Sequence, residues 1–242
     1  MSAIQSQWLD LNPSLRAWYA HPTSPGPHPA VLVFIEAFGV NEHFRELAER
    51  LAKAGYCAVV PDIYHGKVYD YTDFDGAIGH LRTLKDDQVM TEAQTAVASI
   101  LQRPEVRGPR VGVLGFCMGG RYAFLANAEL GERVAATVAF YGGGIAPDKD
   151  PAGRPPLLGH VDKMQAPLLL LYGAEDQSIA PEEHGRIATA LSTARKRYTL
   201  TVFPGAPHGF FSDRRDSYRA EPAHEAWEMT LNHLQRGLGV RA

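Results

Sequence analysis

The feature that most constrains this 242-residue chain is an alternation of buried-strand patterns and helical patterns. Continuous apolar runs are typical of strands covered on both faces, and each run here precedes or follows a stretch with helical spacing. The predicted strands cover residues 30–36, 57–63, 110–116, 135–141, 167–173 and 197–203. The predicted helices cover residues 41–54, about 91–103, a segment beginning at Met118, about 181–191 and about 221–234. This order predicts a mainly parallel sheet with helices on both faces.

The composition is typical of one globular α/β domain over residues 1–242. Hydrophobic residues make up 45% and charged residues 21%, and the formal net charge is −3 without any basic run. These values do not favour binding to nucleic acid or to an anionic membrane. Residues 21–29 and 142–156 are rich in Pro and Gly, and we interpret both as loops rather than domain linkers.

Cys57 and Cys117 are the only cysteines. Two cysteines do not form a disulfide framework and are typical of a reducing compartment. The first residues lack the pattern of a secretory signal, and the apolar runs are too short to span a bilayer. We therefore expect a cytoplasmic protein.

Cys117 lies at the break between a predicted strand and a predicted helix, in the stretch GFCMGG. A nucleophile at such a break needs a sharp turn, and the small residues Gly115 and Gly119 allow the strand and helix to pass closely. The N-terminus of the helix that begins at Met118 would stabilise a thiolate. The alternative is an unreactive buried thiol at a Gly-rich turn.

Two further reactive residues follow later predicted strands. Asp176 lies just after residues 167–173, and His208 lies shortly after residues 197–203. Ligands bind at the carboxyl ends of the strands in such sheets, and the chain order nucleophile, acid, histidine is that of the α/β-hydrolase triad. Glu175 is an alternative to Asp176, and both acids could simply be solvated loop residues.

Glu36 ends a buried apolar run. A carboxylate there is either an edge residue or a functional group beside Cys117, because the strand that precedes it should lie near the strand that leads to the cysteine. In the second case the backbone N–H groups of Ala37 and Met118 would form an oxyanion hole.

These stretches together resemble the dienelactone hydrolase family, a branch of the α/β-hydrolase fold with a cysteine nucleophile. The resemblance is carried by residues 34–66, by GFCMGG at 115–120, by YGAEDQSIAP at 172–181 and by HGF from His208. It implies a catalytic triad of Cys117, His208 and Asp176, with Glu36 contacting the thiol and helping to set its charge. It also implies carboxymethylenebutenolidase-like activity on enol-lactones and related esters, some of them intermediates in chloroaromatic breakdown, without a cofactor.

The chain departs from the family where a substrate carboxylate is bound. Members that bind a dienelactone carboxylate use arginines, one of them a few residues after the histidine, but the fourth residue after His208 is Ser212. The arginines that follow the histidine are Arg214 and Arg215, and Arg82 is another candidate. Arginine binds carboxylates through two parallel hydrogen bonds, although these side chains could equally be surface residues. The candidate substrate contacts are Arg82, Arg214, Phe38 and Tyr141.

The predicted function is hydrolysis of an enol-lactone or a small activated ester through an acyl-thioester. Two alternatives remain: a more general thiol esterase, and a non-catalytic binding protein with the same fold. No metal-ligand motif such as H-E-x-x-H is present, so a metal hydrolase is not favoured. The expected partner is a small molecule, and a monomer is compatible with the sequence.

Overall fold

The computed structural model describes residues 3–150 and 152–239. Its strands are β1 (Ile4–Asn12), β2 (Leu15–Pro22), β3 (His28–Phe34), β4 (Cys57–Pro61), β5 (Val106–Phe116), β6 (Val134–Phe140), β7 (Leu168–Gly173) and β8 (Tyr198–Phe203). Its α-helices are α1 (Glu42–Lys53), α2 (Phe74–Leu81), α3 (Asp86–Ile100), α4 (Met118–Glu129), α5 (Pro181–Thr193) and α6 (Ala220–Leu238). No helix among the described residues combines the length and the apolar character needed to cross a bilayer.

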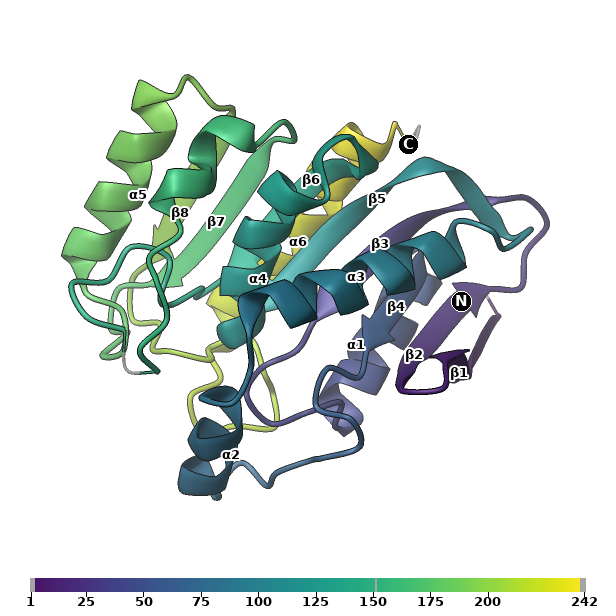
Figure 1. Ribbon diagram of the computed structural model, residues 1–242, viewed down its shortest axis with the longest axis horizontal. Helices are drawn as coiled ribbons and strands as arrows, with labels where there is room; N and C mark the ends of the chain where they lie inside the picture. The colour runs from purple at the N-terminus through teal and green to yellow at the C-terminus, as the bar shows by residue number, and fades with distance from the viewer. Residues whose placement is uncertain (1–2, 151, 240–242) are drawn as a thin grey trace.

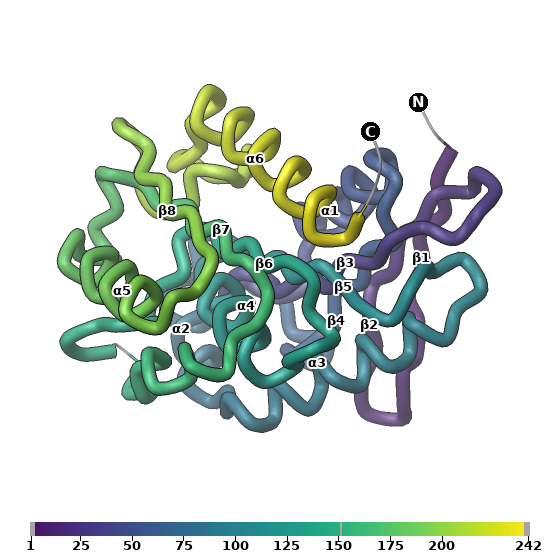
Figure 2. The backbone as a smooth tube through the Cα atoms, turned by 90° about the horizontal axis from the view of Figure 1, so that it is seen from above, coloured from purple at the N-terminus to yellow at the C-terminus, as the bar shows by residue number. Residues whose placement is uncertain are grey.

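The eight strands form one sheet in the order β1-β2-β4-β3-β5-β6-β7-β8. β2 is antiparallel to both of its neighbours, and every other pair from β4 to β8 is parallel. Helices cover both faces: α1 and α6 lie on one, and α3, α4 and α5 lie on the other (Figures 1 and 2). The fold is therefore the predicted α/β architecture with a mainly parallel sheet.

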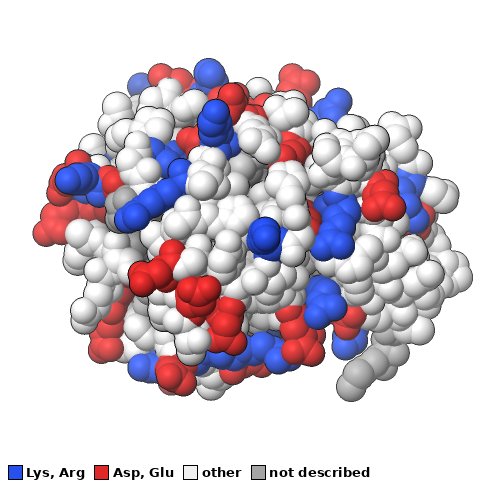
Figure 3. Space-filling view, turned by 60° about the horizontal axis from the view of Figure 1, so that its bottom comes forward, with Lys and Arg blue, Asp and Glu red and all other residues white. Residues whose placement is uncertain are grey.

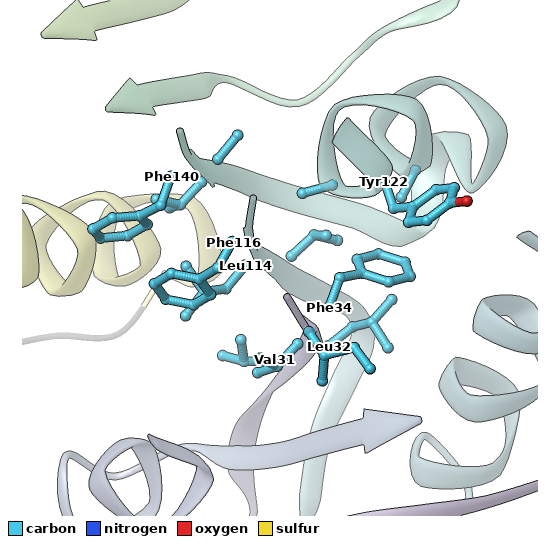
Figure 4. Packing of buried hydrophobic residues seen from close by; sticks show 14 of the residues in the cluster. Val31, Leu32, Phe34, Leu114, Phe116, Tyr122 and Phe140 are labelled. Carbon is cyan, nitrogen blue, oxygen red and sulfur yellow. The ribbon is translucent and has the colours of Figure 1, made fainter. Parts of the chain in front are cut away.

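The core lies between the central strands and these helices. β3, β4, β6 and β7 are buried almost throughout, as expected for parallel strands covered on both faces. Figure 4 shows the packing of large apolar side chains from β3, β5, β6 and α4. This packing fixes the strand ends on which the reactive residues lie.

Several boundaries differ from the sequence predictions. α3 begins at Asp86 rather than near residue 91, and β5 begins at Val106 rather than at residue 110. β1 and β2 were not assigned individually from the sequence, and α2 was missed. α2 has only eight residues and includes Gly76 and Gly79, which are poor helix formers. The predicted N-cap of α1 is confirmed, because the Asn41 side chain accepts a hydrogen bond from the backbone N–H of Phe44 at 3.3 Å.

Candidate active site

Cys117 lies at the tight turn between β5 and α4. Its backbone has φ 55° and ψ −119°, a conformation that costs free energy for any residue other than glycine. The surroundings hold it there: the Cys117 N–H donates to the Phe140 carbonyl at 3.0 Å. A Cβ atom on Gly115 would collide with the Gly119 carbonyl, and one on Gly119 would collide with the Phe34 carbonyl. The two glycines are therefore required for the turn, and the thiol remains only half-buried.

His208 and Asp176 lie beside each other after β8 and β7. The Nδ1 atom of His208 is 2.8 Å from Oδ2 of Asp176. The other carboxylate oxygen accepts hydrogen bonds from the backbone N–H groups of Ser178 at 2.8 Å and Ile179 at 3.2 Å. These bonds fix the carboxylate, whose side chain has no exposed surface. Glu175, the alternative acid, is exposed.

The charge of His208 depends on its two neighbours, Cys117 and Asp176. Burial alone disfavours the imidazolium, but interactions with the Cys117 side chain and the hydrogen bond to Asp176 outweigh it and raise the pKa of His208 to about 10. Cys117 and His208 therefore lie close enough to interact directly. Each of the three residues follows a different strand, and the fold brings them together at one end of the sheet.

Glu36 follows β3 and is fully buried. β3 pairs with β5 so that Phe34 lies opposite Gly115, and this register carries Glu36 towards the turn at Cys117. Its Oε1 accepts a hydrogen bond from the Tyr141 hydroxyl at 3.0 Å, and its Oε2 lies 3.4 Å from Nη1 of Arg215. A buried carboxylate needs such partners.

Tyr141 and Arg215 hold this carboxylate in place. Burial and the charge of Glu36 raise the pKa of Tyr141 well above its usual value, so the phenol keeps the proton that it donates. The Arg215 guanidinium lies over the rings of Phe38 and Tyr71, 5.5 and 5.6 Å from their centroids. Tyr141 has φ 36°, which is unusual for a residue other than glycine. The Tyr141 hydroxyl bonds to Glu36, and Tyr141, an expected substrate contact, is not among the described residues that line the cavity at Cys117.

Ala37 and Met118, the two residues expected to form an oxyanion hole, both contribute to the cavity at Cys117. Among the described residues, neither N–H donates a hydrogen bond, and both residues line the same cavity as Cys117 and His208. Met118 is the first residue of α4, whose N-terminal N–H groups have no partner within the helix. The arrangement can hold an oxygen that carries negative charge.

A cavity of about 240 Å³ opens over the thiol. Its lining is mostly apolar and includes Phe38, one of the expected substrate contacts, together with side chains of α2, a helix that the sequence analysis does not predict. The cavity is lined by residues that follow β3, β5 and β8 and by side chains of α2. α2 lies beyond the carboxyl ends of these strands, at the bottom of Figure 1. Uncharged side chains cover much of this edge of the molecule, with charged ones scattered among them (Figure 3).

The arginines are arranged differently from the sequence expectation. Arg82 is exposed at the end of α2, and Arg214 pairs with Glu42 and Glu46 on α1 at 2.8 and 2.7 Å. Neither lines the cavity, whereas Arg215 and Arg154 do. Arg154 comes from the Gly- and Pro-rich loop after β6, and its only sequence signal is the acid four residues earlier, Asp150.

Three features together define an α/β hydrolase. They are the mainly parallel sheet, the sharp turn at the thiol, and an acid and a histidine that follow later strands. The chain belongs to the dienelactone hydrolase family, whose model matches residues 15–238. It is accordingly a hydrolase of ester or lactone bonds.

Individual relatives agree with this assignment. The chain is 37% identical over 235 residues to a Synechocystis protein named "Putative carboxymethylenebutenolidase", with 94% of each chain covered. It is 32% identical over 238 residues to a "Probable 2-oxo-3-(5-oxofuran-2-ylidene)propanoate lactonase" of Bradyrhizobium, covering 96% of this chain and 94% of that protein. The crystal structure of a "Putative Dienelactone Hydrolase" from Klebsiella pneumoniae superposes with a TM-score of 0.88 at 31% identity, covering 97% of this chain and 99% of the other.

Proposed function

We propose that the protein hydrolyses an enol-lactone, or a small ester with a similarly good leaving group, through an acyl-thioester on Cys117. In this proposal His208 and Asp176 complete the catalytic triad, and the N–H groups of Ala37 and Met118 bind the oxyanion. Glu36 supplies a buried negative charge after β3, the strand that pairs with the strand leading to the thiol.

The observation that carries the proposal is the contact of 2.8 Å between His208 and the buried Asp176, in the cavity into which the half-buried Cys117 opens. An acid hydrogen-bonded to Nδ1 fixes the imidazole tautomer and leaves Nε2 for proton transfer. A binding protein has no need for a charged imidazole beside a thiol on a strained turn, so this contact favours catalysis.

Acylation begins when the Cys117 thiolate attacks the lactone carbonyl. The carbonyl oxygen becomes an oxyanion held by the two backbone N–H groups, and the ring C–O bond then breaks as the carbonyl re-forms. The imidazolium of His208 gives its proton to the departing enolate. The products of this step are a thioester on Cys117 and an enol that rearranges to a ketone.

Deacylation uses the same histidine as a base. Once the sulfur is acylated it carries no charge, so the largest interaction that raises the pKa of His208 is lost and the neutral imidazole becomes accessible. It takes a proton from water, the hydroxide attacks the thioester, and the thiolate leaves with the carboxylic acid as product. The proton on His208 then restores the starting pair.

Cysteine in place of serine favours substrates with good leaving groups. A thiolate is itself a good leaving group, so its tetrahedral adduct goes forward only when the alcohol leaves readily, as an enolate does. Unactivated alkyl esters should therefore be turned over more slowly than enol-lactones of similar size.

The test is turnover of the cis and trans dienelactones by the wild type and by Cys117→Ser. We expect turnover by the wild type and a large loss in the variant. An acid quench early in turnover should also leave an adduct on Cys117 with the full mass of the lactone, because ring opening loses no atoms. Equal turnover of an unactivated alkyl ester, or an adduct on Cys57, would contradict the proposal.

The reaction as proposed uses a small-molecule substrate and water, with no cofactor. The proposal places the protein in the cytoplasm, which the two free thiols of Cys57 and Cys117 support.

A further inference from the structure

Arg154 lines the same cavity as Cys117, from the loop that follows β6. The buried carboxylate of Asp150 holds one edge of its guanidinium: Nη2 donates to Oδ2 at 2.9 Å and Nε donates to Oδ1 at 3.2 Å. The same carboxylate accepts the backbone N–H groups of Ala152 at 2.8 Å and Arg154 at 3.1 Å. The plane of the guanidinium is therefore fixed, and the side chain has little freedom left to lose on binding a ligand.

The other end of this guanidinium is unsatisfied. Nη1 is buried and has no hydrogen-bond partner among the described residues. The Tyr122 hydroxyl lies near it, because Arg154 opposes the effect of burial, which raises the pKa of Tyr122 to about 12. That hydroxyl is likewise buried without a partner among the residues that the structure describes. Buried donors are nearly always bonded, and a charged one without an acceptor costs free energy. A ligand that brings an oxygen to Nη1 would remove this cost.

Arg121 ties the loop that carries Arg154 to the nucleophile. It lies one turn after Cys117 in α4, and its side chain is fully buried. Its Nε donates to the Gly144 carbonyl at 3.1 Å, and its Nη2 donates to the Pro155 carbonyl at 3.0 Å. Both ends of the segment 144–155 are thus bonded to the helix that begins after the thiol. A substrate held at Arg154 would therefore meet the thiol in a set position.

We propose that Arg154 is a specificity-determining residue that donates from Nη1 to a carboxylate oxygen of the substrate while the lactone or ester carbonyl lies at Cys117. A carboxylate is the acceptor that a charged donor binds most strongly. Nη1 lies on the side of the guanidinium away from the edge that Asp150 holds, so the two carboxylates would not compete for the same N–H groups. This inference rests on the proposed function and assigns to it a residue that reads the substrate.

The proposal is compatible with the second guanidinium of the cavity. Arg215 contacts Glu36 through Nη1 at 3.4 Å and donates no other side-chain hydrogen bond among the described residues, so it also has N–H groups to offer. Arg82, the other arginine suggested by the sequence, is exposed at the end of α2 and does not line the cavity. Arg154 and Arg82 are therefore rival candidates that one experiment can separate.

Two enol-lactones test the proposal: the carboxymethylidene and methylidene butenolides, which share the ring and the scissile bond but differ in the carboxylate. Arg154→Met keeps a long side chain and removes the donors. It should lower the carboxymethylidene-to-methylidene ratio of kcat/KM by about 10- to 100-fold, the value of a hydrogen bond to a charged group. The loss should come mainly from a higher KM for the carboxymethylidene lactone, with the methylidene lactone largely unaffected.

A second variant guards against a damaged loop. Arg154→Met leaves the buried Asp150 charge without its cation, which is destabilising, so Asp150→Asn/Arg154→Met removes both charges and should lower the ratio to a similar extent. Arg82→Met is the matched control, because it makes the same change outside the cavity. It should keep the wild-type ratio.

The proposal is overturned if both Arg154 variants keep the wild-type ratio, if they lose the two lactones equally, or if Arg82→Met loses the carboxymethylidene lactone instead. If the wild type hydrolyses neither lactone, the proposed function fails, and protection of Cys117 from iodoacetamide by the carboxymethylidene lactone decides this proposal separately. Weaker protection in Arg154→Met than in the wild type supports it, and equal protection or none in the wild type contradicts it.

Discussion

The two sides of the cavity are built in different ways. On one side Cys117, Asp176 and His208 follow three parallel strands of the sheet, and backbone hydrogen bonds and close glycine contacts fix the turn at Cys117. On the other side α2 is a helix of eight residues whose apolar side chains are largely exposed. The sheet therefore holds the candidate reactive residues, whereas α2 contributes apolar side chains to the lining of the cavity.

The largest effect should come from the acid on the strand-end side. Asp176→Asn keeps the shape of the side chain but removes its charge, so we expect kcat to fall about 10³- to 10⁴-fold. The pKa of His208 should also fall from about 10, because one of the interactions that raise it is lost. The imidazolium would then lose its proton at a lower pH, which NMR titration of the imidazole nitrogens measures.

Glu175→Gln is the matched control, since Glu175 is the neighbouring acid and is exposed. It should change neither kcat nor the titration of His208. A similar loss of kcat in both variants would mean that Asp176 has no special part in the site.

The second effect concerns the accessibility of the two thiols. Iodoacetamide at pH 7.5 should alkylate Cys117 at least about 10³ times faster than Cys57. Cys57 is buried within β4, and burial raises its pKa to about 11, so its thiolate is rare at that pH. Peptide mass spectrometry over time gives both rates, and faster labelling of Cys57 in the native protein would contradict the reactive-thiol assignment.

A third, smaller effect compares one glycine on each side. Gly115→Ala should destabilise the protein by about 2–3 kcal/mol, because the new methyl group would collide with the Gly119 carbonyl. Gly79→Ala in α2 should stabilise it by about 0.5–1 kcal/mol, because nothing lies within 4 Å of a Cβ atom there. Urea unfolding of both variants measures the two free energies, and equal effects would remove the contrast between the two sides.

The two sides also differ in how far the sequence predicts them. Glu36, Cys117 and Asp176 follow largely apolar runs, and the register of a parallel sheet brings such positions to one edge. α2 has no comparable pattern: its apolar residues are exposed, and two glycines weaken its helical signal. The pairing of Arg215 with Glu36 depends on the path of the loop after His208, which no local pattern specifies.

The prediction of one domain over residues 1–242 stays a prediction.

The smallest expected effect comes from the arginine that the sequence suggested as a substrate contact. Arg214 and Arg215 are adjacent, but Arg214 is directed to Glu42 and Glu46 on α1 while Arg215 faces Glu36. Arg214→Ala should leave kcat/KM unchanged for the cis and trans dienelactones, because exposed ion pairs contribute little. Arg215→Ala should lower kcat/KM and the free energy of unfolding, because it leaves the buried Glu36 charge without its cation. A loss of kcat/KM for the dienelactones in Arg214→Ala would instead mean that this side chain turns into the cavity and binds the substrate carboxylate.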